Sequence, residues 1–310
     1  MGGRDVVTGA FSDTGRHIAE RLLAAGRAVA TLTGHPDRPD ALRARIQARP
    51  LQWRDPAALA ASLRGADTLY NTYWVRFARG RTDHGLAVQQ SRALFAAAEL
   101  AGVRRIVHVS ITGADPASPL PYFQGKGQVE AALRTGRTSW AIVRPALIFG
   151  PKDVLLHNIA WLLRRLPVFP VFGDGRYPVQ PVHVDDLAEQ AVAMGGAEAN
   201  LQADAVGPDT FTYEELVARI ASAIGRPRRI LHTPPGLALA GASALGRLLR
   251  DVIVTRDEVR GLMAGLLVSR QPPTGTRRLG DWLDQNAASL GTVWASELDR
   301  HYQSPPQGGA

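Results

Sequence analysis

The sequence predicts an α/β fold, a doubly wound parallel sheet followed by a smaller, mainly helical cap. Three observations predict it. Residues 1–150 alternate short β-type runs with helical ones, a glycine-rich turn follows the first run, and the pattern changes after Gly150. Strands that alternate with helices are typical of βαβ units, in which helices cover both faces of a parallel sheet.

The elements of the first part follow from apolar spacing and from residues that begin or end helices. Ile18, Leu22 and Leu23 have the spacing of one helix face. Pro56 begins a later helix and Gly65 ends it. We expect strands at residues 5–8, 28–33, 51–53, 68–71, 105–110 and 140–143. We expect helices at residues 15–25, 42–47, 56–64, 86–100 and 124–133.

Prolines interrupt the pattern after Gly150, and helices dominate the remainder, at residues 212–224, 236–249, 255–267 and 279–287. We therefore expect a first domain at residues 1–150 and a substrate-binding cap region, interleaved with that core, at 151–302. Residues 303–310 are rich in Pro, Gly and Gln and are expected to be a flexible tail.

Composition excludes several kinds of site and partner. The chain has no cysteine, so disulfides, thiolate nucleophiles and cysteine-bound zinc are excluded. The net charge is +8, but the arginines are scattered, so we expect no nucleic-acid partner. No signal peptide is recognisable, and no apolar run approaches the ~20 residues that span a bilayer. We expect a cytoplasmic protein with no membrane partner; the oligomeric state is open.

The first strand runs into a glycine-rich turn. Gly9 and Gly15 match the first and third glycines of G-x-x-G-x-x-G, and Ser12 occupies the middle position. Such turns bring backbone N–H groups and a helix N-terminus against a pyrophosphate. The alternative is an ordinary strand–helix turn.

The end of the second strand bears on cofactor choice. NAD-selective sites often place a carboxylate there to bind the ribose hydroxyls, whereas this strand ends in Thr33, Gly34 and His35, with Arg38 nearby. Without a carboxylate, nothing repels a 2′-phosphate. We therefore expect NADP(H) to be preferred, with NAD(H) possible.

A tyrosine and a lysine follow the fifth strand. Tyr122 and Lys126 lie four residues apart and share one face of the expected helix. A lysine ammonium favours a neighbouring phenolate, so the tyrosine could exchange a proton with a substrate oxygen while hydride moves. Ser110 or Thr112 could hydrogen-bond the same oxygen. Only two of the 36 basic residues are lysine, which favours chemistry over an incidental surface pair, the alternative.

Other side chains are weaker candidates. Tyr73, Trp74 and Phe77 either line an apolar substrate pocket or simply pack in the interior. His157, on a helix after Gly150, could face the same pocket. We expect no metal site, because Asp185 is a suitable cap for the helix at residues 186–194 and the histidines lack ligand spacing.

The chain resembles the extended and atypical short-chain dehydrogenase/reductases, in the NAD(P)-dependent epimerase/dehydratase-like group. The resemblance rests on TGAFSDTG, NTYW, VHVSIT, YFQGK, IVRPALIFG, GDGRYPVQPVHVDDLA and TRDEV. It implies an NAD(P)-binding Rossmann fold and a catalytic Ser110, Tyr122 and Lys126. It implies dinucleotide contacts at Gly9, Ala10, Ser12, Asp13, Thr14, Gly15, Asn71, Thr72 and Lys126, and from Pro145 to Ile148.

The resemblance predicts an oxidoreductase that transfers hydride between NADP(H) and a carbonyl or alcohol of a small, largely apolar substrate. Two alternatives stay open. A nucleotide-sugar epimerase or dehydratase would retain NAD, and the missing carboxylate after the second strand disfavours it. A non-enzymatic NAD(P)-binding accessory protein is disfavoured by the intact Tyr122 and Lys126. Ser12 in place of a glycine is a departure that could alter the phosphate turn.

Overall fold

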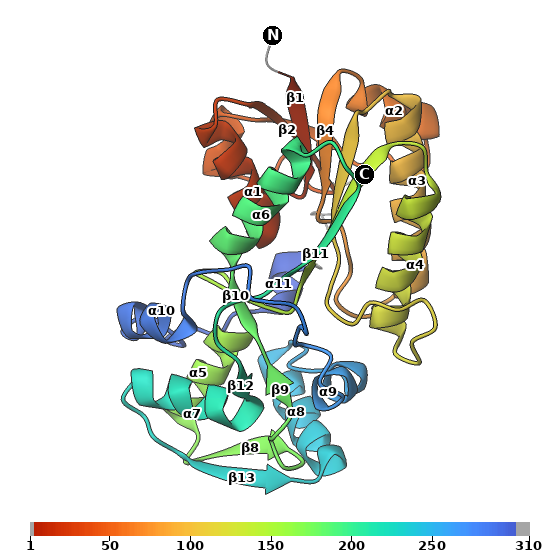
Figure 1. Cartoon of the computed structure of the whole chain (residues 1–310). Coiled ribbons are helices and arrows are strands. Elements are labelled where there is room, and N and C mark those ends of the chain that lie inside the picture. The colour runs from red at the N-terminus through yellow and green to blue at the C-terminus, as the bar shows by residue number, and fades with distance from the viewer. Residues whose placement is uncertain (1–2, 302–310) are drawn as a thin grey trace, which may run out of the picture. The chain divides into compact units, whose positions relative to one another are not determined.

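The computed structural model of the chain describes residues 3–301 and confirms the doubly wound α/β fold (Figure 1). The chain divides into two compact units. Within the described residues, the first unit consists of residues 3–145 and 184–205, and the second of residues 146–183 and 206–301. The expected tail at residues 303–310 lies outside the described residues.

The first unit is built on a parallel sheet of seven strands in the order β11-β6-β5-β4-β1-β2-β3. Strand β1 pairs with β2 on one side and with β4 on the other, so the strand order reverses there. Ligand sites in this class of sheet form at such a switch point. The strands are β1 (Arg4–Thr8), β2 (Ala28–Thr33), β3 (Gln47–Pro50), β4 (Ala66–Asn71), β5 (Arg105–Val109), β6 (Ser139–Pro145) and β11 (Leu201–Ala205).

Helices cover both faces of this sheet. Helices α1 (Asp13–Ala24) and α6 (Val184–Gly196) pack together in one layer, and α2 (Pro56–Leu63), α3 (His84–Leu100) and α4 (Pro121–Thr135) form the other (Figure 1). Every residue of the central strand β5 is consequently buried. Its apolar side chains pack with those of α3 and α4 in one core, which includes Leu94, Phe95, Ile106, Val129 and Leu133.

The second unit combines short strands with helices. Strand β7 (Leu147–Phe149) pairs with β10 (Pro181–His183), β8 (Val168–Phe172) with β13 (Arg229–Thr233), and β9 (Pro178–Val179) with β12 (Phe211–Thr212). The helices are α5 (Leu155–Arg165), α7 (Tyr213–Ala223), α8 (Pro235–Leu249), α9 (Arg256–Met263), α10 (Leu279–Asn286) and α11 (Glu297–His301). Capping boxes begin α7 at Thr212 and α9 at Thr255.

Three local predictions were wrong. The strand expected at residues 51–53 is β3, at Gln47–Pro50, because an edge strand tolerates polar residues and proline that a central strand would not. The helix expected at residues 42–47 is a single 3₁₀ turn, Ala41–Ala44. The third wrong prediction is that Asp185 caps the following helix. Helix α6 begins at Val184, so Asp185 lies inside its first turn. The Oδ1 of Asp185 lies 2.7 Å from Nδ1 of His17.

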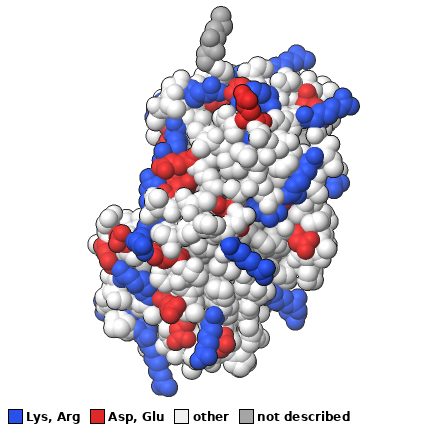
Figure 2. All heavy atoms as spheres, viewed as in Figure 1, with Lys and Arg blue, Asp and Glu red and all other residues white. Residues whose placement is uncertain are grey.

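Figure 2 shows basic side chains in separate groups with acidic side chains between them, rather than one continuous basic field on this face. Across residues 3–301, no helix combines the length and the apolar character that a bilayer span requires.

Candidate functional site

The glycine-rich turn between β1 and α1 is held by its own backbone. Gly9 has a φ of 66°, in the left-handed region that glycine tolerates, and its N–H donates to the carbonyl of Leu32 at 2.9 Å. A Cβ at Gly15 would lie 2.3 Å from the carbonyl oxygen of Gly9. Both glycines are therefore needed, the first for its conformation and the second so that α1 can approach the turn.

Ser12 occupies the middle glycine position without disturbing this turn. Its Oγ and its N–H both donate to the carbonyl of Gly9, at 2.6 and 2.8 Å. The hydroxyl makes no capping bond to α1, although Ser12 is its N-cap residue. The side chain of Ser12 thus does not cap α1, and a phosphate group is a suitable acceptor at a helix N-terminus.

The remaining turn residues differ in what they can offer a phosphate. The N–H of Ala10 donates to Oγ1 of Thr31 at 3.0 Å, so it is already satisfied. Asp13 and Thr14 are the first helical residues of α1. The positive end of the helix dipole lies at these residues, and such an end attracts anions.

The end of β2, at Thr33, Gly34 and His35, carries no carboxylate. Oγ1 of Thr33 accepts from the N–H of His35 at 3.2 Å, and Arg38 is exposed. The half-buried Asp40, which follows β2, is paired with Arg16 and also accepts from the N–H of Leu42. Its carboxylate is thus already bound by a cation and a backbone donor.

The end of β4 is tied to β1 and β5 by a buried polar network. Oγ1 of Thr8 accepts from the N–H of Thr72 at 2.8 Å, and Oγ1 of Thr72 donates to the carbonyl of Thr8 at 2.6 Å. The Asn71 side chain is fully buried, and its Nδ2 lies 3.1 Å from Nδ1 of His108. Asn71 therefore orders the strand ends, and its side chain is occupied within the protein.

Tyr122 and Lys126 lie on the first two turns of α4. Lys126 is buried, and its Nζ donates to the carbonyl of Val109 at 2.8 Å. The same Nζ lies 4.8 Å from the centre of the Trp74 ring. Burial lowers the pKa of Lys126 to about 7, against the opposing effect of the Glu130 carboxylate. This lysine can therefore lose and regain a proton near neutral pH.

Ser110 and Thr112 extend the pairing of β5 with β6. Their N–H groups donate to the carbonyls of Val143 and Pro145, at 2.7 and 2.9 Å. Both side chains are buried. Among the described residues, the Ser110 Oγ has no hydrogen-bond partner. A buried hydroxyl without a partner is costly, and a substrate or cofactor oxygen would satisfy it.

The rings of Trp74 and His84 meet beside Tyr122. The ring of Trp74 is stacked on that of His84 at 5.9 Å, and Tyr122 meets both edge-on, at 5.9 and 5.6 Å. Gly125 makes the close approach of Trp74 possible, because a Cβ there would lie 2.9 Å from the indole. Trp74 thus lies at the tyrosine, as a substrate-lining residue would.

Tyr73 contacts different residues. Its ring packs against Trp53 at 5.0 Å, and its hydroxyl donates to Gln90. Phe77 is buried. Trp74 is in ring contact with Tyr122, and the contacts described for Tyr73, with Trp53 and Gln90, are those of packing.

Two candidates belong to the second unit. Ile148 is the middle residue of β7 and pairs with Val182. His157 lies on α5 with its Nδ1 3.1 Å from Asp153, and its ring contacts Trp282. Their proposed roles stay predictions.

Sequence reasoning missed three groups that lie against Tyr122 or act on Lys126. They are His84, Glu130 and the carbonyl of Val109. A histidine directly after the capping Asp83 was the only signal for His84, and it is a weak one. Glu130 lies one helical turn after Lys126, which does predict a charge contact.

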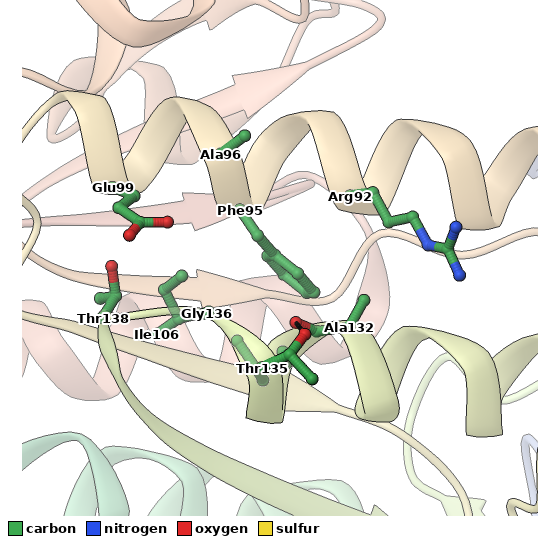
Figure 3. A pocket seen from close by; sticks show the side chains of 10 residues that line it. Arg92, Phe95, Ala96, Glu99, Ile106, Ala132, Thr135, Gly136 and Thr138 are labelled. Carbon is green, nitrogen blue, oxygen red and sulfur yellow. Dashed lines mark hydrogen bonds between the residues drawn. The ribbon is translucent and has the colours of Figure 1, made fainter.

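A separate hollow of about 200 Å³ opens between α3 and α4 (Figure 3). Its lining includes Arg92, Phe95 and Glu99 of α3 and Ala132 and Thr135 of α4. None of the candidate site residues lines it. Within the part of the chain that is described, no group of three histidine or acidic side chains could hold a metal ion.

The chain is similar to known proteins over most of its length. Residues 9–153 match a family model described as NAD(P)H-binding. The chain is 30% identical to a ceramide reductase of Caulobacter vibrioides over 76% of this chain and 75% of that protein. It is 27% identical to the mitochondrial NADH dehydrogenase (ubiquinone) 1 alpha subcomplex subunit 9 of Arabidopsis thaliana, over 85% of this chain and 70% of that protein.

Uncharacterized proteins of Mycobacterium tuberculosis and Mycobacterium bovis are 32% identical, and this chain spans only 27% of their length. Among solved structures, the fold is similar to that of an NADPH-dependent quinone oxidoreductase of Escherichia coli in complex with NADPH. The TM-score is 0.74, with 21% identity over 90% of this chain and 98% of that one.

Proposed function

Because this chain belongs to the NAD(P)H-binding family, in the class of the NAD(P)-dependent epimerases and reductases, we propose that it is an NADP(H)-dependent reductase. Its substrate would be a carbonyl compound, or the corresponding alcohol, that is small and largely apolar. One observation carries the proposal: Lys126, buried at the carbonyl of Val109, lies one helical turn from Tyr122.

Two features of the chain fit a nicotinamide dinucleotide. The turn at Gly9 and Gly15 leaves no room for a Cβ where α1 meets it, and the Ser12 side chain makes no capping bond to α1. The N–H groups of Asp13 and Thr14 would hold the diphosphate. When bound, the nicotinamide supplies or accepts the hydride.

Preference for NADP(H) is supported by the end of β2. No carboxylate stands at Thr33, Gly34 or His35, and Asp40 is already paired with Arg16. The exposed Arg38 is the cation available to a 2′-phosphate. An arginine binds phosphate oxygens through two parallel hydrogen bonds.

The acid–base step is assigned to the side chains of β5 and α4. In reduction, a hydride adds to the carbonyl carbon, and the Tyr122 hydroxyl gives its proton to the carbonyl oxygen. Ser110 Oγ would donate a hydrogen bond to the same oxygen. The ammonium form of Lys126 stabilises the phenolate that remains. Bulk solvent then returns a proton to Tyr122.

The rings of Trp74, His84 and Tyr122 support an apolar substrate, because flat aromatic surfaces favour apolar or aromatic groups. Similarity to a reductase of a lipid and to a reductase of quinones is consistent with that class of substrate.

A second candidate function is an accessory NAD(P)-binding protein without turnover. The similarity to a subunit of mitochondrial NADH dehydrogenase favours it. It would retain the dinucleotide contacts of the Gly9 turn but would not need the acid–base pair.

The test combines binding with turnover. Fluorescence titration should show tighter binding of NADPH than of NADH, and a clear preference for NADH would contradict the cofactor assignment. A screen of quinones, azo dyes and apolar ketones for NADPH oxidation should identify a substrate. Tyr122→Phe should then lower kcat by roughly 10²–10⁴-fold with NADPH binding retained. Binding without turnover across the screen would favour the accessory role.

A further inference from the structure

Helix α8 exposes an apolar face. Across residues 3–301, Leu237 and Leu248 are among the most exposed large apolar side chains, at 68% and 79%. They lie eleven residues apart, which is three helical turns, so they share one side of α8. The exposed residues between them on that side are small: Ala240, Gly241 and Ala244.

The opposite side of α8 packs in the interior of the second unit. Ala238 is buried in a small cluster with Phe172 and Val259, and Leu239 packs against the same cluster. A Cβ at Gly246 would lie 2.7 Å from the carbonyl of Asp251. The helix is thus apolar on both sides, and only one side has a partner among the described residues.

The segment of chain that carries α8 is rich in arginine and contains no acid. Residues 225–250 contain five arginines and neither aspartate nor glutamate. Arg226, Arg229, Arg247 and Arg250 are exposed, and no ion pair is described for them. The first acid after the segment, Asp251, is buried and accepts from Trp294 Nε1 at 2.8 Å.

We propose that the outer face of α8 docks on an anionic phospholipid surface. Leucines that lie at the acyl boundary, bordered by arginines that meet the phosphates, are typical of helices that lie in a membrane interface. Charge disfavours a second copy of this chain as the occupant, because a two-fold interface would bring Arg247 and Arg250 of both copies together, and residues 225–250 supply no acid to neutralise them.

Vesicle sedimentation tests the proposal. The protein should sediment with vesicles of equal parts phosphatidylglycerol and phosphatidylcholine, and roughly tenfold more weakly with phosphatidylcholine alone. Combined Leu237→Gln and Leu248→Gln should weaken binding by roughly tenfold or more. Leu100→Gln is the matched control, because Leu100 is also 79% exposed but lies on α3 of the first unit.

The basic border is tested separately. Combined Arg247→Gln and Arg250→Gln should weaken binding about 25-fold, at about fivefold for each arginine. Arg54→Gln, at another exposed arginine, should leave it unchanged. Failure of the wild-type protein to sediment with the anionic vesicles would overturn the proposal, as would equal binding by all variants.

The absence of native cysteine allows a test of position. A polarity-sensitive dye on Ala244→Cys should shift its emission to the blue on anionic vesicles, and the same dye on Ala61→Cys of α2 should not. Vesicle binding without a shift at residue 244 would place the contact elsewhere and overturn the proposal. A third outcome is that the protein binds no vesicles but forms a dimer, and that the combined Leu237→Gln and Leu248→Gln substitutions abolish the dimer. That outcome would assign the face to a second copy instead.

Discussion

Lys126 is joined to Val109 by a hydrogen bond of 2.8 Å from its Nζ to the main-chain carbonyl. That contact ties α4, which carries Tyr122, to the last residue of β5. It fixes the ammonium at a position where burial, rather than a charged partner, dominates its pKa.

Replacing Lys126 with arginine should lower turnover by roughly 100-fold or more, although the positive charge is kept. The planar guanidinium is larger than an ammonium and would have to fit between Val109 and the Trp74 ring, and its pKa is too high for proton exchange. Steady-state kinetics with the substrate found by screening measure the effect. Lys152→Arg, in an exposed turn, is the matched control and should behave as wild type. Normal turnover by Lys126→Arg would refute the proposed chemistry.

Replacing Lys126 with methionine should change how stability depends on pH. In the folded protein the pKa of Lys126 is about 7, whereas the unfolded chain keeps the proton up to about 10.5. Between these values the unfolded state binds more protons, so the free energy of unfolding rises with pH by up to about 1.4 kcal/mol per unit. Below pH 7 the cost of burying the charge is present in full.

Urea unfolding of both proteins from pH 6 to pH 10 measures this difference. The stability of wild type relative to Lys126→Met should be lowest at the acidic end and should increase above about pH 7. A difference that stays constant over the range would show that Lys126 keeps an ordinary pKa.

Gly15→Ala should abolish NADPH binding and destabilise the protein by roughly 1–3 kcal/mol. The new methyl group would lie 2.3 Å from the carbonyl of Gly9, so α1 or the turn must shift. Gly196→Ala is a suitable control, because a Cβ there meets nothing within 4 Å. Calorimetry gives both quantities for each variant, and unimpaired binding by Gly15→Ala would place the dinucleotide site elsewhere.

Arg105→Met should destabilise the protein by roughly 2–5 kcal/mol. Arg105 is fully buried and donates to the carbonyls of Met194 and Ala199, at 2.8 Å each. Methionine would leave these acceptors, at and after the end of α6, without their donor. Arg54→Met, at an exposed position, should change stability by less than about 0.5 kcal/mol. Denaturant unfolding measures the stability of both variants and of wild type. If Arg105→Met were as stable as wild type, water would have replaced the guanidinium.

The sequence predicted the central strands well because burial on both faces favours apolar residues, as at Ile106, Val107 and Val109 of β5. Edge strand β3 lacks this signal, and its residues, Gln47–Pro50, are largely polar. The same limit applies to Arg105, since a fully buried arginine is rare and only its three-dimensional partners explain it.

In the candidate site, too, local spacing could be predicted from the sequence and contacts between elements could not. Tyr122 and Lys126 are four residues apart on a helix, so their spacing predicts a shared face. The partner of Lys126 is a main-chain carbonyl on another element, and His84 meets Tyr122 across two helices. Such contacts depend on how elements pack, which no local pattern encodes.

The two-segment construction of the first unit has a consequence for synthesis on the ribosome. Strand β11 belongs to the sheet of the first unit and helix α6 to the same unit, yet residues 146–183 are translated before both. Until residues 184–205 have emerged, β6 lacks its outer neighbour and Arg105 lacks its carbonyl acceptors. The nascent chain must therefore keep an unfinished sheet edge exposed while part of the second unit is made. At a few residues per second, that interval lasts several seconds, in which chaperones have time to act.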